Sequence, residues 1–217
     1  MHLALIHTSP AAIAPLARYY GEREPEWKLT NLLDDGLLRF FRERREDDAE
    51  GALASLVDRA AGYGARAALL TCSAVSLALL SRLQARSPVP LVKIDVPMAR
   101  AAVSQARRIG VLVSFAPTLQ PTVSLLQETT ASLGRKVEIV PQLCDGAYPA
   151  LLAGDTATHD RILQSGAEEL AARPVEAIVL AQVSMAHLRD SLAGALSLPV
   201  FSSLETSHAA VREALGL

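Results

Sequence analysis

A cysteine after an apolar run is the feature of this sequence best suited to chemistry. Cys72 comes directly after the apolar run Ala67–Thr71 and precedes Ser73-Ala74. With a helix expected to begin near Ser73, the thiol would meet free backbone N–H groups and the positive end of the helix dipole, which favour the thiolate. The same N–H groups can bind a substrate carboxylate. The pattern predicts a reactive cysteine, against the alternative of a small buried hydrophobe, which is the commoner fate of an unpaired cysteine.

Other polar residues follow apolar runs in the same way. His7 ends the first run of the chain, and Gln182 follows the run Glu176–Ala181. Together with Cys72 they form the predicted catalytic set, and His7 is the additional acid/base group to test first. The predicted substrate-binding residues, which supply hydroxyl or backbone N–H donors nearby, are Thr8, Ser9, Ser73, Ala74, Thr118, Thr122, Val183 and Ser184.

The elements that must position these residues alternate along the chain. Short, continuously apolar runs predict strands that are buried on both faces, and the segments between them have helical spacing. This alternation predicts an α/β fold with mainly parallel, four-stranded sheets. The predicted strands are Leu3–His7, Trp27–Leu33, Ala67–Thr71, Leu91–Ile94, Arg108–Ser114, Lys136–Leu143, Glu176–Ala181 and Pro199–Ser202. The predicted helices are Ala11–Tyr20, Asp48–Gly62, Ser73–Ala85, Met98–Arg107, Pro121–Leu133, His159–Ala172, Met185–Leu196 and His208–Leu215.

The sequence also contains a weak internal repeat. Four segment pairs recur in the same order at offsets of 108 to 110 residues, each at the end of a predicted strand. They are Leu3–Thr8 with Val111–Ala116, Leu32–Gly36 with Gln142–Gly146, Ala68–Ala74 with Ile178–Ser184 and Pro90–Val92 with Pro199–Phe201. We expect two pseudo-symmetric three-layer lobes, 1–95 completed by a C-terminal helix at 205–217, and 96–204. Ligands of open α/β sheets bind beyond the carboxyl ends of the strands, so the expected site is a cleft between the lobes.

Three strings of the sequence resemble those of the aspartate/glutamate/hydantoin racemase family. They are Ile6-His7-Thr8-Ser9-Pro10, Leu70-Thr71-Cys72-Ser73-Ala74 and Lys93-Ile94-Asp95-Val96-Pro97-Met98. The resemblance covers essentially the whole chain and implies paired α/β lobes, no cofactor and a small carboxylate-bearing substrate. It also implies two cysteines that move a proton on opposite faces of the carbon next to a carboxylate. The first family cysteine falls on Cys72.

The second family cysteine is replaced in this chain. The repeat places Gln182 at that position, and a neutral amide has no usable proton affinity, although it can donate a hydrogen bond. Cys144 does not fill the gap, because the repeat places it opposite Asp34. Three functions remain open: a racemase-like isomerase that uses Cys72, a single-cysteine decarboxylase acting on a malonate-type acid, and a non-catalytic carboxylate-binding protein.

Composition excludes several other classes of function. The chain has 217 residues, 21 basic against 23 acidic, and only 4% aromatic residues, so a nucleic acid partner is not expected. No glycine-rich nucleotide motif occurs, and the histidines form no i,i+4 pair that would predict a metal site. With two cysteines, no long apolar segment and no signal peptide pattern, we expect a cytoplasmic protein without a membrane partner. The sequence does not fix the oligomeric state. A homodimer or higher homo-oligomer is a common assembly of proteins of this kind and is one expectation.

Overall fold

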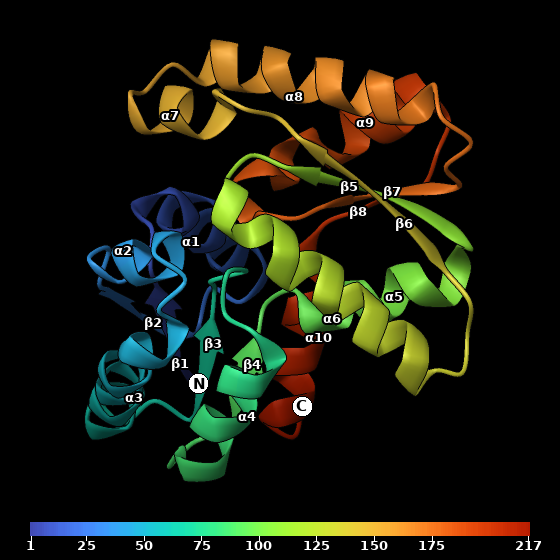
Figure 1. The fold of residues 1–217 in the computed structure, drawn as a ribbon. Coiled ribbons are helices and arrows are strands. Elements are labelled where there is room, and N and C mark those ends of the chain that lie inside the picture. The colour runs from blue at the N-terminus through green and yellow to red at the C-terminus, as the bar shows by residue number, and fades with distance from the viewer. The chain divides into compact units, whose positions relative to one another are not determined.

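The chain folds into two compact units. The computed structural model describes residues 1–217 and divides them into Met1–Ile94 with Leu204–Leu217, and Asp95–Ser203 (Figure 1). Each unit contains a four-stranded parallel sheet with flanking helices. The predicted fold class, an α/β fold with two similar lobes, is therefore confirmed. No helix is long and apolar enough to cross a membrane.

The first unit has the strand order β2-β1-β3-β4. Its inner strands β1 and β3 are buried along their whole length, whereas the edge strand β2 is partly exposed, as its polar residues require. Helix α3 packs against β1, β2 and β3. Helix α10 returns to this unit, where His208 and Arg212 both bond Glu24 at the end of α1. The elements are β1 (His2–His7), η1 (Pro10–Ala12), α1 (Ile13–Arg23), β2 (Lys28–Leu33), α2 (Leu37–Arg42), α3 (Glu46–Gly62), β3 (Ala67–Leu70), α4 (Leu77–Arg86), β4 (Leu91–Lys93) and α10 (Ser203–Ala214).

The second unit repeats this plan with the strand order β6-β5-β7-β8. Helix α8 packs on β5 and β6, and Figure 1 shows α5 and α6 on the opposite face of the sheet. The elements are α5 (Val96–Gln105), β5 (Arg108–Val113), η2 (Ala116–Thr118), α6 (Leu119–Ser132), β6 (Glu138–Leu143), α7 (Ala147–Leu152), α8 (Thr156–Ala171), β7 (Ala177–Leu180), η3 (Val183–Leu188), α9 (Arg189–Leu196) and β8 (Val200–Phe201).

The strand registers define the internal repeat residue by residue. Leu3 pairs with Ala67 in the first sheet, and Ile109 pairs with Ala177 in the second. The repeat offset is therefore 110 between β3 and β7, which equates Cys72 with Gln182 as the sequence predicted. The offset between β1 and β5 is 106 rather than the predicted 108. The prediction aligned the two strands by their apolar residues, whereas strand pairing shows which residues of β1 and β5 are equivalent.

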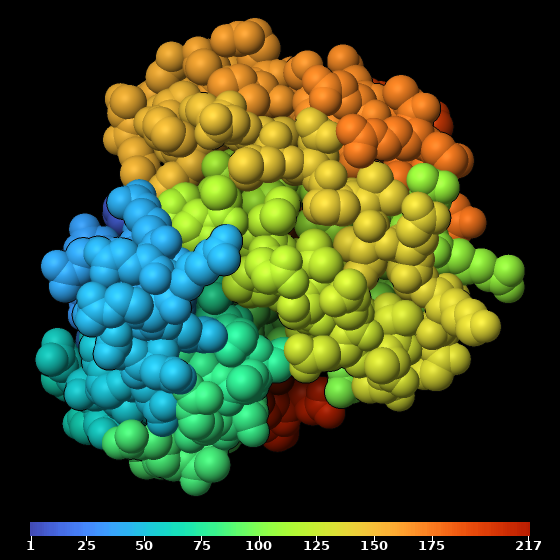
Figure 2. Space-filling view, in the orientation of Figure 1, coloured from blue at the N-terminus to red at the C-terminus, as the bar shows by residue number.

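The charged run Arg39–Glu50 is exposed but is not one helix. Arg44 adopts a positive φ of 56° and separates α2 from α3. The light-blue α2 segment lies at the surface in Figure 2. Within this run Arg45 bonds Asp48, and Arg82 of α4 reaches Glu50. The run thus links α3 to α4 through solvated ion pairs.

Candidate functional site

The first unit gathers its candidate residues at the carboxyl edge of its sheet. Strand β1 ends at His7, and its neighbour β3 ends at Leu70, two residues before Cys72. Because both strands are parallel, their carboxyl ends lie at the same edge. The residue between β3 and the cysteine, Thr71, continues the pairing through its backbone N–H to the Ile6 carbonyl, 3.0 Å away.

The imidazole of His7 is fully engaged inside this unit. Its Nδ1 lies 2.9 Å from the Thr71 hydroxyl, and its Nε2 lies 2.9 Å from Oδ1 of Asn31 on β2. The Thr71 hydroxyl also donates to the Ile6 carbonyl at 3.1 Å. His7 is completely buried. Both ring nitrogens therefore connect β1 with its two neighbouring strands.

Burial also sets the charge of His7. It lowers the pKa of His7 below 6.5, and the hydrogen bond to Asn31 opposes this shift only in part. The imidazole is therefore neutral in the folded protein at neutral pH. The sequence predicted His7 as an acid/base group at an open strand end, and the structure shows its side chain buried between Thr71 and Asn31.

The lowered pKa of His7 predicts a pH-dependent stability. Below about pH 6.5 the unfolded chain binds a proton that the folded chain resists, so the free energy of unfolding decreases as pH falls. Urea unfolding between about pH 7.5 and 5 should show a steeper loss in the wild type than in His7→Gln. Asn31→Ala, at an exposed position, removes the bond that raises this pKa and should steepen the loss. Equal slopes in all three proteins would contradict this assignment.

Cys72 lies in a turn rather than at the beginning of a helix. Helix α4 begins at Leu77 with Ser76 as its N-cap, four residues later than predicted, because the Ser76 hydroxyl accepts a hydrogen bond from Leu79 N–H. The Cys72 carbonyl instead accepts from Val75 N–H at 3.4 Å. The Glu46 carboxylate fixes the end of this turn by accepting from Ser76 N–H at 2.5 Å. The local geometry thus replaces the predicted helix start at Cys72 with a buried turn that precedes the helix.

The other first-unit candidates lie in the same two segments. Thr8 and Ser9 follow β1, and the Ser9 hydroxyl caps η1 by accepting from Ala11 N–H at 3.2 Å. Ser73 and Ala74 lie in the turn after Cys72. Cys72 is 5% exposed, and Thr8, Ser73 and Ala74 are buried to a similar degree.

In the second unit, Gln182 joins the ends of β5 and β7. Its Oε1 accepts from the Ser114 N–H at 3.0 Å and from the Ser114 hydroxyl at 3.2 Å. Its Nε2 donates to the Thr118 hydroxyl, which in turn donates to the Phe115 carbonyl at 2.7 Å. The Gln182 amide is therefore held in one orientation by both its oxygen and its nitrogen, and one amide hydrogen is left to donate.

The remaining second-unit candidates surround this amide along the chain. Thr118 ends η2, and Thr122 lies one turn later in α6 with a buried hydroxyl that has no hydrogen-bond partner. Val183 and Ser184 begin η3 directly after Gln182 and are both buried. A buried hydroxyl without a partner is rare and marks Thr122 as a site that a ligand oxygen could satisfy.

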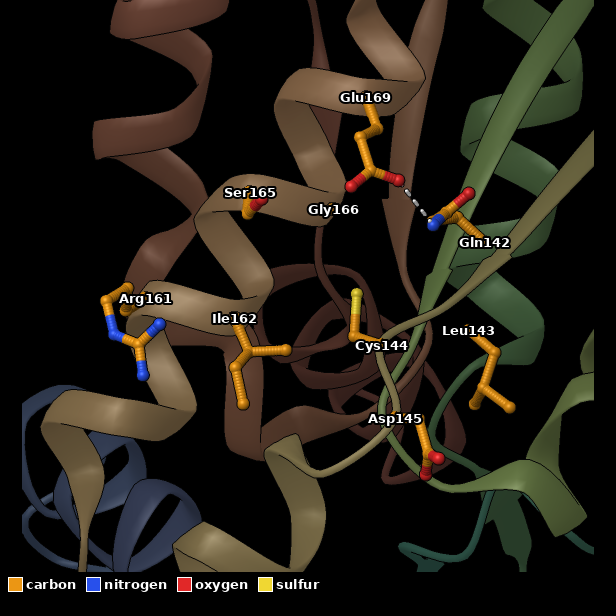
Figure 3. A pocket seen from close by; sticks show the side chains of 9 residues that line it. All are labelled: Gln142, Leu143, Cys144, Asp145, Arg161, Ile162, Ser165, Gly166 and Glu169. Atoms are coloured by element: carbon orange, nitrogen blue, oxygen red, sulfur yellow. Dashed lines mark hydrogen bonds between the residues drawn. The ribbon is translucent and has the colours of Figure 1, made fainter.

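Cys144 belongs to a different environment. It follows β6 and lines a pocket of about 360 Å³ between β6 and α8, where its sulfur points toward Gly166 (Figure 3). Burial, with a smaller contribution from Glu169, raises the pKa of Cys144 to about 11, so the thiol stays protonated at neutral pH. The registers place Cys144 opposite Asp34, as predicted. Its position and its protonation favour a structural role for Cys144.

Several residues were not recognised from the sequence. Asn31 and Glu46 hold His7 and the turn after Cys72, and Ser114 holds Gln182. Asn31 interrupts the otherwise apolar end of its strand, which is the one signal that could have identified it. Glu46 carries no such signal, because its partner is a backbone N–H group 30 residues away.

Known structures share the fold of the whole chain. A glutamate racemase from Bacillus anthracis has a TM-score of 0.79 at 16% identity, over 99% of this chain and 81% of that one. A glutamate racemase from Francisella tularensis in complex with D-glutamate has a TM-score of 0.78 at 10% identity, over 99% and 80%. An allantoin racemase from Klebsiella pneumoniae has a TM-score of 0.73 at 16% identity, over 100% and 89%.

Sequence comparison gives the family. No curated protein matches the chain. The profile of the Asp/Glu/Hydantoin racemase family matches residues 37–214, which is most of the chain. These residues include the turn at Cys72 and the strand ends of the second unit. The chain therefore belongs to the Asp/Glu/hydantoin racemase family and is an isomerase of that type.

Proposed function

We propose that Cys72 moves a proton to and from the carbon next to the carboxylate of a small amino acid or related acid, without a cofactor. The observation that carries this proposal is that the two copies of the internal repeat differ at one equivalent position. Position 72 holds a thiol, whereas the equivalent position 182 holds an amide that is bonded through both its oxygen and its nitrogen. One unit thus supplies a group that can exchange a proton, and the other supplies a fixed hydrogen-bonding group.

The proton balance of this step is simple. The Cys72 thiolate takes the α-hydrogen, so a C–H bond breaks, an S–H bond forms and the electron pair stays on the substrate as an enolate. The reverse transfer returns a proton to carbon. Backbone N–H groups of Ser73 and Ala74, with the hydroxyls of Thr8 and Ser9, stabilise the charge that develops on the carboxylate oxygens. Donors fixed in a buried turn need no reorganisation during the reaction.

Gln182 binds rather than reacts in this proposal. Its free amide hydrogen donates to the substrate, while its oxygen stays with Ser114. The hydroxyl of Thr122 provides a further donor, and Thr118 orients the amide. Val183 and Ser184 contribute the backbone N–H groups that begin η3. These groups hold a carboxylate without taking a proton from it.

His7 acts as a positioning residue. Its bond to the Thr71 hydroxyl fixes the residue directly before Cys72, and its bond to Asn31 fixes the ring. Because its pKa is lowered, it does not add a charge beside the thiol at neutral pH. We expect His7→Gln to lower kcat and to leave both limbs of the pH–rate profile in place. Loss of an acid/base group would instead remove one limb of that profile.

The family and the glutamate racemase in complex with D-glutamate support the choice of a small amino acid or related acid as substrate. Incubation in D₂O with each enantiomer of glutamate, aspartate and allantoin, followed by proton NMR, tests the proposal. We expect deuterium to replace the hydrogen on the reacting carbon of at least one of these compounds. If none exchanges above the rate without protein, the proposed proton transfer is wrong for these substrate classes.

A further inference from the structure

A cluster of two histidines and an aspartate lies in the second unit, on side chains that the proposed function does not use. His159 and Asp160 are in the first turn of α8, and His187 is in η3, the segment that follows β7. His159 Nδ1 lies 2.7 Å from Asp160 Oδ1, and His187 Nε2 lies 2.9 Å from the same oxygen. The three atoms all lie within 4.8 Å of one another. The sequence did not reveal this cluster, because the histidines are 28 positions apart.

The hydrogen bonds of His187 leave one of its nitrogens facing the carboxylate. Its Nδ1 lies 3.1 Å from the Ser184 carbonyl oxygen, which can only accept, so Nδ1 carries a hydrogen. In the neutral ring, Nε2 then has a lone pair that points at an oxygen of Asp160. Two acceptors at this distance repel each other unless a positive charge lies between them. A cation bound between the two atoms would satisfy both.

His159 is the buried member of the cluster. The side chain of His159 is completely buried, yet its Nε2 has no hydrogen-bond partner. Its other nitrogen, Nδ1, faces Asp160, so Nδ1 is the atom with which His159 would bind an ion.

We propose that His159, Asp160 and His187 bind a divalent transition-metal ion of the Zn²⁺ type. Two imidazole nitrogens and one carboxylate oxygen are a known ligand set for Zn²⁺. Tetrahedral ligands at about 2.0–2.1 Å from Zn²⁺ lie about 3.3 Å apart, so small side-chain shifts would open the cluster around an ion. The Ser184 carbonyl orients His187, as a backbone acceptor does for metal-bound histidines. His187 is half exposed, which leaves the fourth position open to water.

The ion would join two elements that the chain otherwise connects through β7. It would hold η3 against the first turn of α8, and η3 begins directly after Gln182. Metal binding should therefore raise the thermal stability of the protein. This inference does not depend on the proposed proton transfer, because it concerns different side chains.

Zn²⁺ and Co²⁺ titrations of the metal-stripped protein test the site. We expect one ion per chain with a micromolar or tighter Kd, a higher Tm with Zn²⁺, and Co²⁺ absorption bands typical of tetrahedral nitrogen and oxygen ligands. His187→Gln and Asp160→Asn should each weaken binding at least about tenfold. Both positions are partly exposed, so these variants should keep the fold and the metal-free Tm of the wild type.

His2→Gln is the matched control, because it removes an imidazole that lies outside the cluster and bonds Thr30 in the first unit. It should bind Zn²⁺ as the wild type does. The proposal is overturned if the wild type shows no saturable binding, or if the two cluster variants bind as tightly as the wild type. Thiolate-to-Co²⁺ charge-transfer bands would also overturn it, because they would assign the ion to a cysteine.

Discussion

Cys72→Ser and Cys72→Ala should abolish exchange of the substrate α-proton. A hydroxyl at position 72 is far too weak an acid to supply the anion that takes the proton, and a methyl group supplies none. Loss of a positioned acid/base group typically lowers the rate by about 10²–10⁴-fold. We therefore expect exchange in both variants to fall by at least about a hundredfold, measured by deuterium incorporation under identical conditions.

Cys144→Ser is the matched control for these variants. It also replaces a buried thiol, but one that follows β6 and stays protonated because burial raises its pKa to about 11. Its exchange rate should remain within a few-fold of the wild type. If Cys144→Ser lost activity and Cys72→Ser kept it, the roles of the two cysteines would have to be reversed.

Gly166→Ala should destabilise the second unit, although it adds only one methyl group. A Cβ at Gly166 would clash with the Cys144 sulfur and lie 3.2 Å from Leu112 Cδ1, both in the buried layer between α8 and the sheet. Overpacking of this kind costs about 1–3 kcal/mol, which exceeds the gain of up to about 1 kcal/mol that alanine brings to a helix. Urea unfolding followed by circular dichroism measures the difference.

Two further variants separate the clash from helix propensity. Gly51→Ala in α3 meets nothing within 4 Å and should stabilise the protein slightly. In a Cys144→Ala background, Gly166→Ala should lose most of its cost, because the sulfur that it meets is gone. Equal costs of Gly166→Ala with and without the Cys144 sulfur would show that the two residues are not coupled.

The fold was predictable because its signals are local. Continuous apolar runs such as Ala67–Thr71 can be buried only inside a parallel sheet, so each strand was placed to within two residues. The short helices α2 and α7 were not predicted, because six residues give too little periodicity and Gly36 and Gly146 read as turns. Helix α4 was predicted to begin too early, because the apolar residues that follow Cys72 hide the Ser76 cap.

The candidate site was only partly predictable. The strand ends identified Cys72 and Gln182, and the registers equate them across the two units. The partners of His7 could not be predicted, because Asn31 meets it only through strand pairing and Thr71 through the register of β3. The His159, Asp160 and His187 cluster depends in the same way on the packing of α8, which local sequence does not encode.

The stereochemistry of exchange tests the central claim most directly. If Cys72 is the only side chain that moves the proton, it acts on one face of the substrate, and Gln182 cannot deliver a proton to the other. Both rates are measured in D₂O, starting from one pure enantiomer of a substrate that exchanges. Loss of the α-hydrogen gives the rate of exchange, and the change of optical rotation gives the rate of inversion. We predict that deuterium enters one enantiomer faster than that enantiomer inverts. Equal rates of exchange and inversion from both enantiomers would contradict a single acid/base and require a second group in the place assigned to Gln182.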